Sequence, residues 1–169
     1  AAVVRIVFDK YVYEGYGPGG VAVIVETLTD NRNRTAGDLR HYFDKYGGNL
    51  GQTGSVSWQF QRKGLFVIEA DGVDEDALME AALEAGAEDF SSDGDIFEIF
   101  TLPEDLDSVR DELENKGYVL ASCDTDKIPS NYVELTDEED IKKMNLLLEH
   151  LEENDDVVNV YHNWNADDE

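Results

Sequence analysis

Apolar and polar residues alternate, or recur at helical spacing, along most of the chain. Alternation among β-branched and aromatic residues predicts strands at residues 3–13, 21–28, 55–61, 65–70, 87–92, 95–102, 118–123 and 157–164. Apolar residues three and four apart predict helices, which we expect at residues 34–46 and 74–85, between Pro103 and Gly117, and from Thr136 to Leu151. The run GYGPGG (15–20) predicts a tight turn, and Asp93-Gly94 predicts a hairpin.

The ends of these helices carry sequence signals of their own. Gly47 and Gly48 are typical of a helix C-terminus, and Asp74 of an N-terminus. Thr136 with Glu139 three residues later has the pattern of a capping box. The residues expected on the buried helical faces are Ala36, Leu39, Phe43, Tyr46, Leu78, Ala81, Ala82, Ala85, Leu106, Val109, Leu113, Ile141, Met144, Leu148 and Leu151.

The order of elements predicts an α+β protein with two α/β-sandwich subdomains. From residue 64 the order is strand, helix, strand, hairpin, strand, helix, strand, which is the βαββαβ order of a ferredoxin-like sandwich. The last helix and strand have no place in that complete sandwich, so we expect them to return to the sheet of residues 1–62. We therefore predict a discontinuous domain of residues 1–63 and 136–169, interrupted by a ferredoxin-like domain of residues 64–135.

Composition narrows the class of protein. The chain of 169 residues has 41% hydrophobic residues and a net charge of −26, so a core can form despite the acidity. Residues 65–169 hold 33 acids and five bases; a solvated surface is the simplest interpretation, with adaptation to high salt or mimicry of nucleic acid as alternatives. No run of 18 apolar residues occurs, no signal peptide is visible, and the charge disfavours anionic membranes. Cys123 is the single cysteine, which suits a reducing compartment such as the cytoplasm.

Familiar chemical motifs are weak in this chain. Gly15-x-Gly17-x-x-Gly20 precedes a strand, whereas a dinucleotide fingerprint opens a helix. Asp124-x-Asp126 lacks the glycine and glutamate of a calcium loop. The three histidines do not share a metal-ligand spacing and lie far in the sequence from Cys123, whose thiolate is disfavoured by the nearby Asp124 and Asp126. We therefore expect no catalytic residues, no metal site and no cofactor.

One stretch, which we call the cationic window (residues 31–63), has the opposite charge. It holds six bases and two acids, a net charge of +4. Arg32 and Arg34 are expected just before a helix, and Trp58 is expected to alternate with Phe60 and Arg62 on a strand, where it offers a stacking surface. The predicted nucleic-acid contacts are Arg32, Arg34, Arg40, His41, Lys45, Arg62 and Lys63. The alternative is that these bases neutralise neighbouring acids and that Trp58 belongs to the core.

These residues are similar to those of the YebC/PmpR family. The matching stretches are YEGYGPGGVAVIVETLTDNRNRTAGDLRHYFDKYGGNLG (13–51), SVSWQFQRKG (55–64) and the pattern from NYVEL (131–135) to the terminal helix and strand. The resemblance implies an α/β second domain interrupted by a ferredoxin-like third domain, behind an N-terminal helical bundle. That basic bundle is absent from this sequence, and residues 1–10 do not match the family, so we expect a fragment or a short form.

The resemblance also implies function. Family members are described as DNA-binding transcriptional regulators, and others resemble translation factors that act on the ribosome, including a mitochondrial activator. We therefore expect a non-enzymatic regulator of gene expression whose partner is DNA, with ribosomal RNA as the alternative. An acidic protein-interaction module that binds a basic protein is the second alternative. The expected location is the cytoplasm, or the mitochondrial matrix for a eukaryotic member, with no membrane partner.

Overall fold

The computed structural model describes residues 5–166 and divides the chain into two compact units. Unit 1 comprises residues 1–60 and 129–169, and unit 2 comprises residues 61–128. Unit 2 therefore interrupts unit 1 in the sequence, with junctions a few residues before those drawn from the sequence. None of the helices within residues 5–166 is long and apolar enough to span a bilayer.

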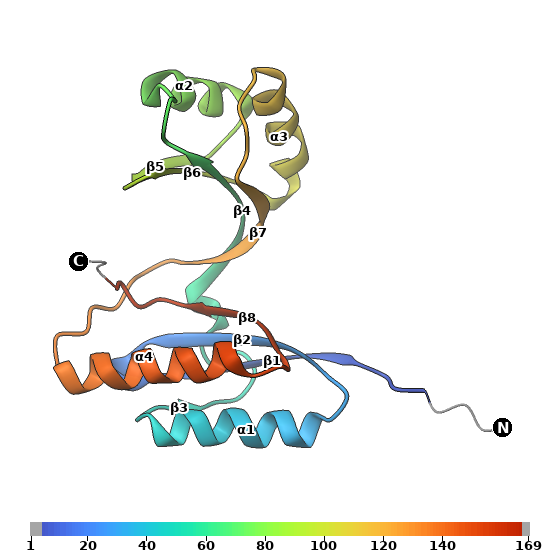
Figure 1. The fold of residues 1–169 in the computed structure, drawn as a ribbon, viewed down its shortest axis with the longest axis vertical. Coiled ribbons are helices and arrows are strands. Elements are labelled where there is room, and N and C mark those ends of the chain that lie inside the picture. The colour runs from blue at the N-terminus through green and yellow to red at the C-terminus, as the bar shows by residue number, and fades with distance from the viewer. Residues whose placement is uncertain (1–4, 167–169) are drawn as a thin grey trace. The chain divides into compact units, whose positions relative to one another are not determined.

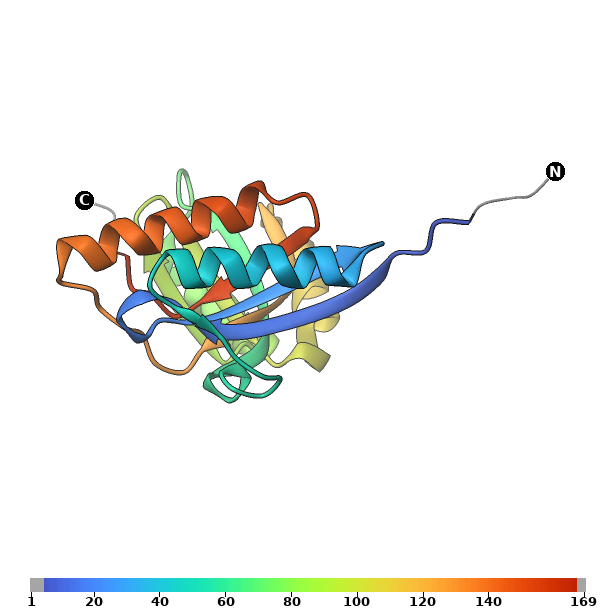
Figure 2. The ribbon, with the colours of Figure 1, turned by 90° about the horizontal axis from the view of Figure 1, so that it is seen from below.

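Unit 1 is a four-stranded antiparallel sheet with two helices on one face. Its strands follow the order β3-β1-β2-β8, and Figures 1 and 2 show both helices across the same side of the sheet. The strands are β1 (Asp9–Tyr16), β2 (Ala22–Thr29), β3 (Asn49–Leu50) and β8 (Val157–His162). The helices are α1 (Arg32–Lys45) and α4 (Glu138–Glu153).

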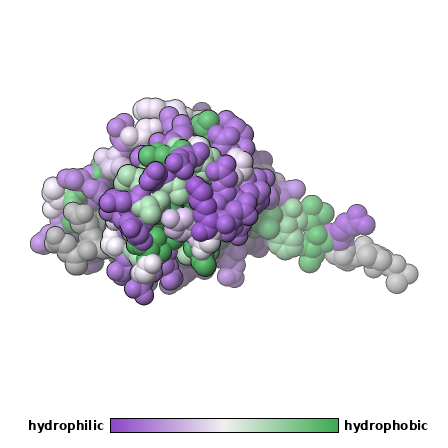
Figure 3. Space-filling model, turned by 90° about the horizontal axis from the view of Figure 1, so that it is seen from above, coloured by the Kyte–Doolittle hydropathy of each residue, from purple (hydrophilic) through white to green (hydrophobic). Residues whose placement is uncertain are grey.

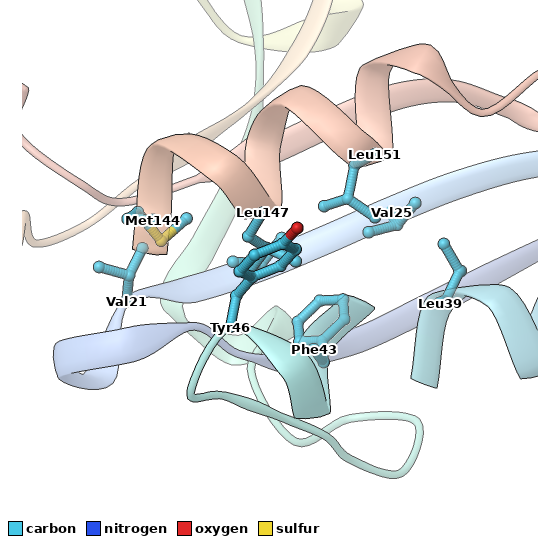
Figure 4. Close-up of a cluster of buried hydrophobic side chains, with 9 residues drawn as sticks. Val21, Val25, Leu39, Phe43, Tyr46, Met144, Leu147 and Leu151 are labelled. Atoms are coloured by element: carbon cyan, nitrogen blue, oxygen red, sulfur yellow. The ribbon is translucent and has the colours of Figure 1, made fainter. Parts of the chain in front are cut away.

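The core of unit 1 lies between this sheet and the two helices. Alternate side chains of a strand point to opposite faces, so Val21, Val23 and Val25 face the helices together. They pack against buried residues of both helices and of the end of α1, shown in Figure 4: Leu39, Phe43, Tyr46, Met144, Leu147 and Leu151. A smaller cluster of Ala22, Ile24 and Val56 occupies the opposite face of the sheet.

Unit 2 is a ferredoxin-like sandwich. Its strands are β4 (Phe60–Glu69), β5 (Asp89–Asp93), β6 (Ile96–Thr101) and β7 (Ser122–Pro129), and its helices are α2 (Glu75–Ala85) and α3 (Leu106–Asn115). The sheet order β5-β6-β4-β7 is the one that a βαββαβ chain forms when both helices cross on one face, and it confirms the predicted fold. The buried residues are Phe66, Ile68, Leu78, Ala81, Ala82, Phe97, Ile99, Val109 and Leu113.

Most predicted helical core positions are confirmed, and the exceptions lie at the edges of the buried faces. Ala36, Ala85, Leu106, Ile141 and Leu148 are only partly buried. The capping residue of α4 is Asp137, whose side chain accepts a hydrogen bond from the Glu139 N–H at 2.9 Å, rather than Thr136.

Three strand predictions were wrong in position. The first strand begins at Asp9 and includes Gly15 and Tyr16, which the sequence pattern placed in a turn. The expected strand 55–61 is a loop with a 3₁₀ turn at Ser57–Gln59, and β4 continues from Phe60 to Glu69. The expected strand 118–123 moves to Ser122–Pro129, because the Tyr118 N–H closes the end of α3 on the Leu113 carbonyl at 3.1 Å.

The segment before β1 is apolar and exposed. Residues 5–8 have no regular structure, whereas residues 3 and 4 of the expected first strand lie outside the described part of the chain. Figure 3 shows this segment as a green stretch, and the exposed side chains are Ile6, Val7 and Phe8.

Candidate nucleic-acid interface

The cationic window is divided between the two units. Five of its predicted contact residues lie on α1 of unit 1, and Arg62 and Lys63 lie on β4 of unit 2. Arg62 donates a hydrogen bond to the Thr125 hydroxyl at 3.3 Å within unit 2. The candidate surface is therefore built from unit 1 alone, and the five residues on α1 are Arg32, Arg34, Arg40, His41 and Lys45.

The helix α1 begins two residues earlier than its apolar pattern predicts. The Asn31 side chain accepts a hydrogen bond from the Arg34 N–H at 3.1 Å, so Asn31 is the N-cap. Arg32 and Arg34 are thus in the first helical turn, and the expectation that they precede the helix was wrong. Because these two arginines are two residues apart in a helix, their side chains point to different sides of it.

Arg34 is held by carboxylates. Its guanidinium donates to Asp156 at 3.0 Å and to Asp30 at 3.2 Å, and these hydrogen bonds, the one to Asp156 first, raise the pKa of Arg34. Asp156 also accepts from the buried Thr35 hydroxyl at 2.8 Å. The charge of Arg34 is therefore used within unit 1, where it helps to join α1 to the chain that follows α4.

Arg32 and Arg40 lie together on the other flank of α1. With Lys10 of β1 they line a groove of about 570 Å³, which we call the cationic groove. The Arg32 guanidinium lies 4.9 Å from the centre of the Tyr11 ring, a cation–π distance. Among residues 5–166 none of the three bases is in an ion pair. The remaining lining residues are Tyr11, Val12, Tyr13, Glu14, Leu50, Gly51, Gln52 and Thr53.

The cationic groove follows an edge of the sheet. The strand β1 pairs with β2 over its whole length but with β3 only at Gly15 and Tyr16, so residues 9–14 have no second strand partner in the described structure. The Glu14 carbonyl points to this edge, because it accepts the Gly51 N–H at 2.8 Å. Because the backbone of a strand repeats every two residues, the peptide groups of Val12 and Lys10 point to the same side as that of Glu14. Their N–H groups can donate to an anion there.

Glu14 fixes the loop at the end of this groove. Its side chain is 4% exposed, and its carboxylate accepts N–H bonds from Gly54 at 2.7 Å, Val56 at 3.1 Å and Ser57 at 2.7 Å. Burial raises the pKa of Glu14, but the backbone hydrogen bonds outweigh burial and the net pKa is lowered. We call residues 51–59 the anchored loop.

Trp58 projects from the anchored loop. Its side chain is 72% exposed, and its indole N–H donates to the Ser55 carbonyl at 3.0 Å. Trp58 lies in the 3₁₀ turn, so its predicted alternation with Phe60 and Arg62 on a strand was wrong. The alternative that placed Trp58 in the core was also wrong.

His41 and Lys45 are exposed on α1 but do not line the cationic groove. The Lys45 ammonium lies 5.5 Å from the centre of the Tyr46 ring, and the His41 ring is 6.2 Å from that of Tyr42. The structure thus brings two of the seven predicted residues together with Lys10, which the sequence pattern did not single out. No group of His, Cys, Asp and Glu that could hold a metal ion occurs within residues 5–166.

Comparison with known proteins places this fold. The family model described as TACO1/YebC second and third domain matches residues 8–164. A probable transcriptional regulatory protein of Caldicellulosiruptor bescii is 58% identical over 163 residues, which are 96% of this chain and 67% of that protein. A protein of the same description from Finegoldia magna is 59% identical over 157 residues, 93% of this chain and 65% of the relative.

A solved structure agrees with both units. The crystal structure of a conserved hypothetical protein from Aquifex aeolicus has a TM-score of 0.87 and 43% sequence identity, covering 99% of this chain and 69% of its own. The chain therefore spans about two thirds of the length of the relatives that it matches. With a family model matched over nearly all of its length, and more than half of its residues shared with the Caldicellulosiruptor bescii and Finegoldia magna proteins, the chain belongs to the TACO1/YebC family.

Proposed function

We propose that the chain is part of a non-enzymatic regulator of gene expression that binds the sugar–phosphate backbone of a nucleic acid through the cationic groove. The names of the relatives support a regulatory role. The observation that carries the nucleic-acid contact is the gathering of Lys10, Arg32 and Arg40 around one groove, without ion pairs among the described residues, on a chain of net charge −26.

Electrostatics favours this groove over the rest of the molecule. Unit 2 contains five basic and twenty acidic residues, so a polyanion is repelled by it as a whole. A phosphate in the cationic groove meets a lining that includes Arg32, Arg40 and Lys10, together with the outward N–H groups of β1. DNA and ribosomal RNA present the same phosphate chemistry, so both are candidate ligands and the experiment must include both.

The test is a binding titration with the whole chain. Fluorescence anisotropy of labelled DNA and RNA oligonucleotides is measured at several salt concentrations for the wild type and for the double variant Arg32→Glu/Arg40→Glu. We expect the variant to bind at least about tenfold more weakly and to have a salt slope smaller by about two, because two phosphate contacts are lost.

The matched control is Lys142→Glu/Lys143→Glu on α4, which makes the same change in net charge elsewhere in unit 1. We expect this control to change affinity much less than the groove variant. Equal losses in the two variants would show an unlocalised charge effect and would contradict the proposed site. Binding of a basic protein by a chain that binds neither DNA nor RNA would favour the interaction module instead.

A further inference from the structure

Trp58 is exposed on the anchored loop, part of which lines the cationic groove, and this arrangement is typical of a ligand-binding surface. Resting on the proposed function, we propose that the ligand is single-stranded nucleic acid: its phosphates lie in the cationic groove and one unstacked base stacks on the Trp58 ring. Trp58 is then a base-contacting residue, and Glu14 is a positioning residue that holds the ring beside the groove.

The exposure of Trp58 is unusual for its residue type. Tryptophan is largely buried on average, and here 72% of the residue is in contact with solvent. Its indole N–H is already bonded to the Ser55 carbonyl, so the ring has no polar group left to direct toward a hydrogen-bonding partner. What Trp58 offers is its π face, which stacks on any base regardless of sequence.

Trp58 and part of the lining of the cationic groove belong to the same loop. Gly51, Gln52 and Thr53 of the anchored loop line the groove, and Trp58 follows Thr53 by five residues. Five residues span at most about 18 Å between Cα atoms, a distance that a few nucleotides of a flexible strand can cover. A strand whose phosphates lie in the groove can therefore place a nearby base on Trp58.

Glu14 connects the two parts. Glu14 is among the residues that line the groove, and its carboxylate is the shared acceptor for three N–H groups of the anchored loop, which fix the backbone on both sides of Val56. A loop held in this way does not have to be ordered when the ligand binds, so less affinity is lost to conformational entropy.

The same geometry selects against duplexes. Bases in a double helix are stacked on each other and can reach an aromatic ring only after unpairing, which costs a few kcal/mol. Single strands present their bases without that cost. A preference for single-stranded over double-stranded ligand is therefore the signature that distinguishes stacking on Trp58 from phosphate binding alone.

The test uses Trp58 as its own reporter. In a Trp164→Phe background Trp58 is the only tryptophan, and titration with a single-stranded 12-mer is expected to quench its fluorescence while the matching duplex does so much less. The variant Trp58→Ala is expected to bind the single strand about 5- to 150-fold more weakly with an unchanged salt slope and unchanged duplex affinity. Trp58→Tyr is expected to restore most of the affinity, since it restores an aromatic ring.

The positioning role of Glu14 has a separate readout. Glu14→Gln retains one carbonyl acceptor, and we expect it to lower the ratio of single-strand to duplex affinity, because the ring is held less firmly beside the groove. Faster amide hydrogen exchange at residues 54–57 would accompany that loss.

The outcomes separate the inference from the proposed function. If Arg32→Glu/Arg40→Glu weakens binding but Trp58→Ala binds single strands like the wild type, stacking is refuted and the backbone contact stands. If the wild type binds no nucleic acid at low salt, both are refuted. Equal losses for single strands and duplexes in Trp58→Ala also overturn the inference.

Discussion

The two flanks of α1 use the same residue type in opposite ways. Arg34 is bonded to Asp156 and Asp30, whereas Arg32 lies over Tyr11 without an ion pair among the described residues. Two residues of sequence separate them. The difference shows that a count of bases locates a charged stretch but does not tell which cations are available to a ligand, because availability depends on carboxylates brought in from elsewhere in the chain.

The largest change in stability is expected on the flank of α1 that faces the cationic groove, and it follows from replacing an acidic residue, Glu14, rather than a basic one. Replacing Glu14 with Ala leaves three backbone N–H groups of the anchored loop without their acceptor, which we expect to lower the free energy of unfolding of unit 1 by about 3 kcal/mol. Both tryptophans lie in unit 1, so urea denaturation followed by intrinsic fluorescence reports on this unit. A loss below about 1 kcal/mol would mean that water replaces the carboxylate without difficulty.

A smaller loss is expected on the flank that is held by ion pairs. Asp156→Ala removes the nearest acceptor of the Arg34 guanidinium and the nearer of two acceptors of the buried Thr35 hydroxyl, a change that we expect to lower the free energy of unfolding by about 1–2 kcal/mol. The contrasting variant is Arg40→Ala, which we expect to stay within about 0.5 kcal/mol of the wild type because no ion pair is broken. Equal losses measured by urea denaturation would remove the distinction between the flanks.

The smallest expected change in stability comes from removing the charge of Glu14 while keeping the shape of its side chain. Because its pKa in the folded chain is lowered, the ionised form contributes stability that is present at neutral pH and is lost as pH falls below the ordinary value of 4.5 and through the folded pKa. We expect the stability difference between wild type and Glu14→Gln to shrink as pH falls through that range. The difference cancels common contributions, including that of His162, whose pKa is lowered by burial. A difference independent of pH would contradict the role of the charge.

The sequence predicts the fold well wherever local periodicity and tertiary packing agree. Apolar residues with a period of 3.6 or of two residues predict the helices and the ferredoxin-like order of unit 2. They also predict the return of the last helix and strand to unit 1. Residues 55–59 are one exception: their alternation is typical of a strand, but the carboxylate of Glu14, some forty residues earlier, accepts the Val56 and Ser57 N–H groups and holds the chain in a loop.

The candidate site is less predictable for the same reason. Arg32 and Arg40 are visible as part of a basic stretch, but Lys10 joins them only because β1 lies beside the start of α1 and the loop after β3. Likewise, Asp156 follows Arg34 by more than a hundred residues, so no local pattern foretells their bond. Long-range partners decide which residues form the surface.

The junction between the two units has a consequence for synthesis and engineering. The chain leaves unit 1 after Phe60 and re-enters it at Pro129. Beside these two points, the Ser130 N–H donates a hydrogen bond to the Gln59 carbonyl at 2.8 Å. The exit and re-entry points thus already touch, so a short turn could replace the intervening domain without stretching its host. During translation, however, the segments are synthesised in order. The edge of β2 therefore stays unpaired until the whole of unit 2 has been synthesised and β8 follows it.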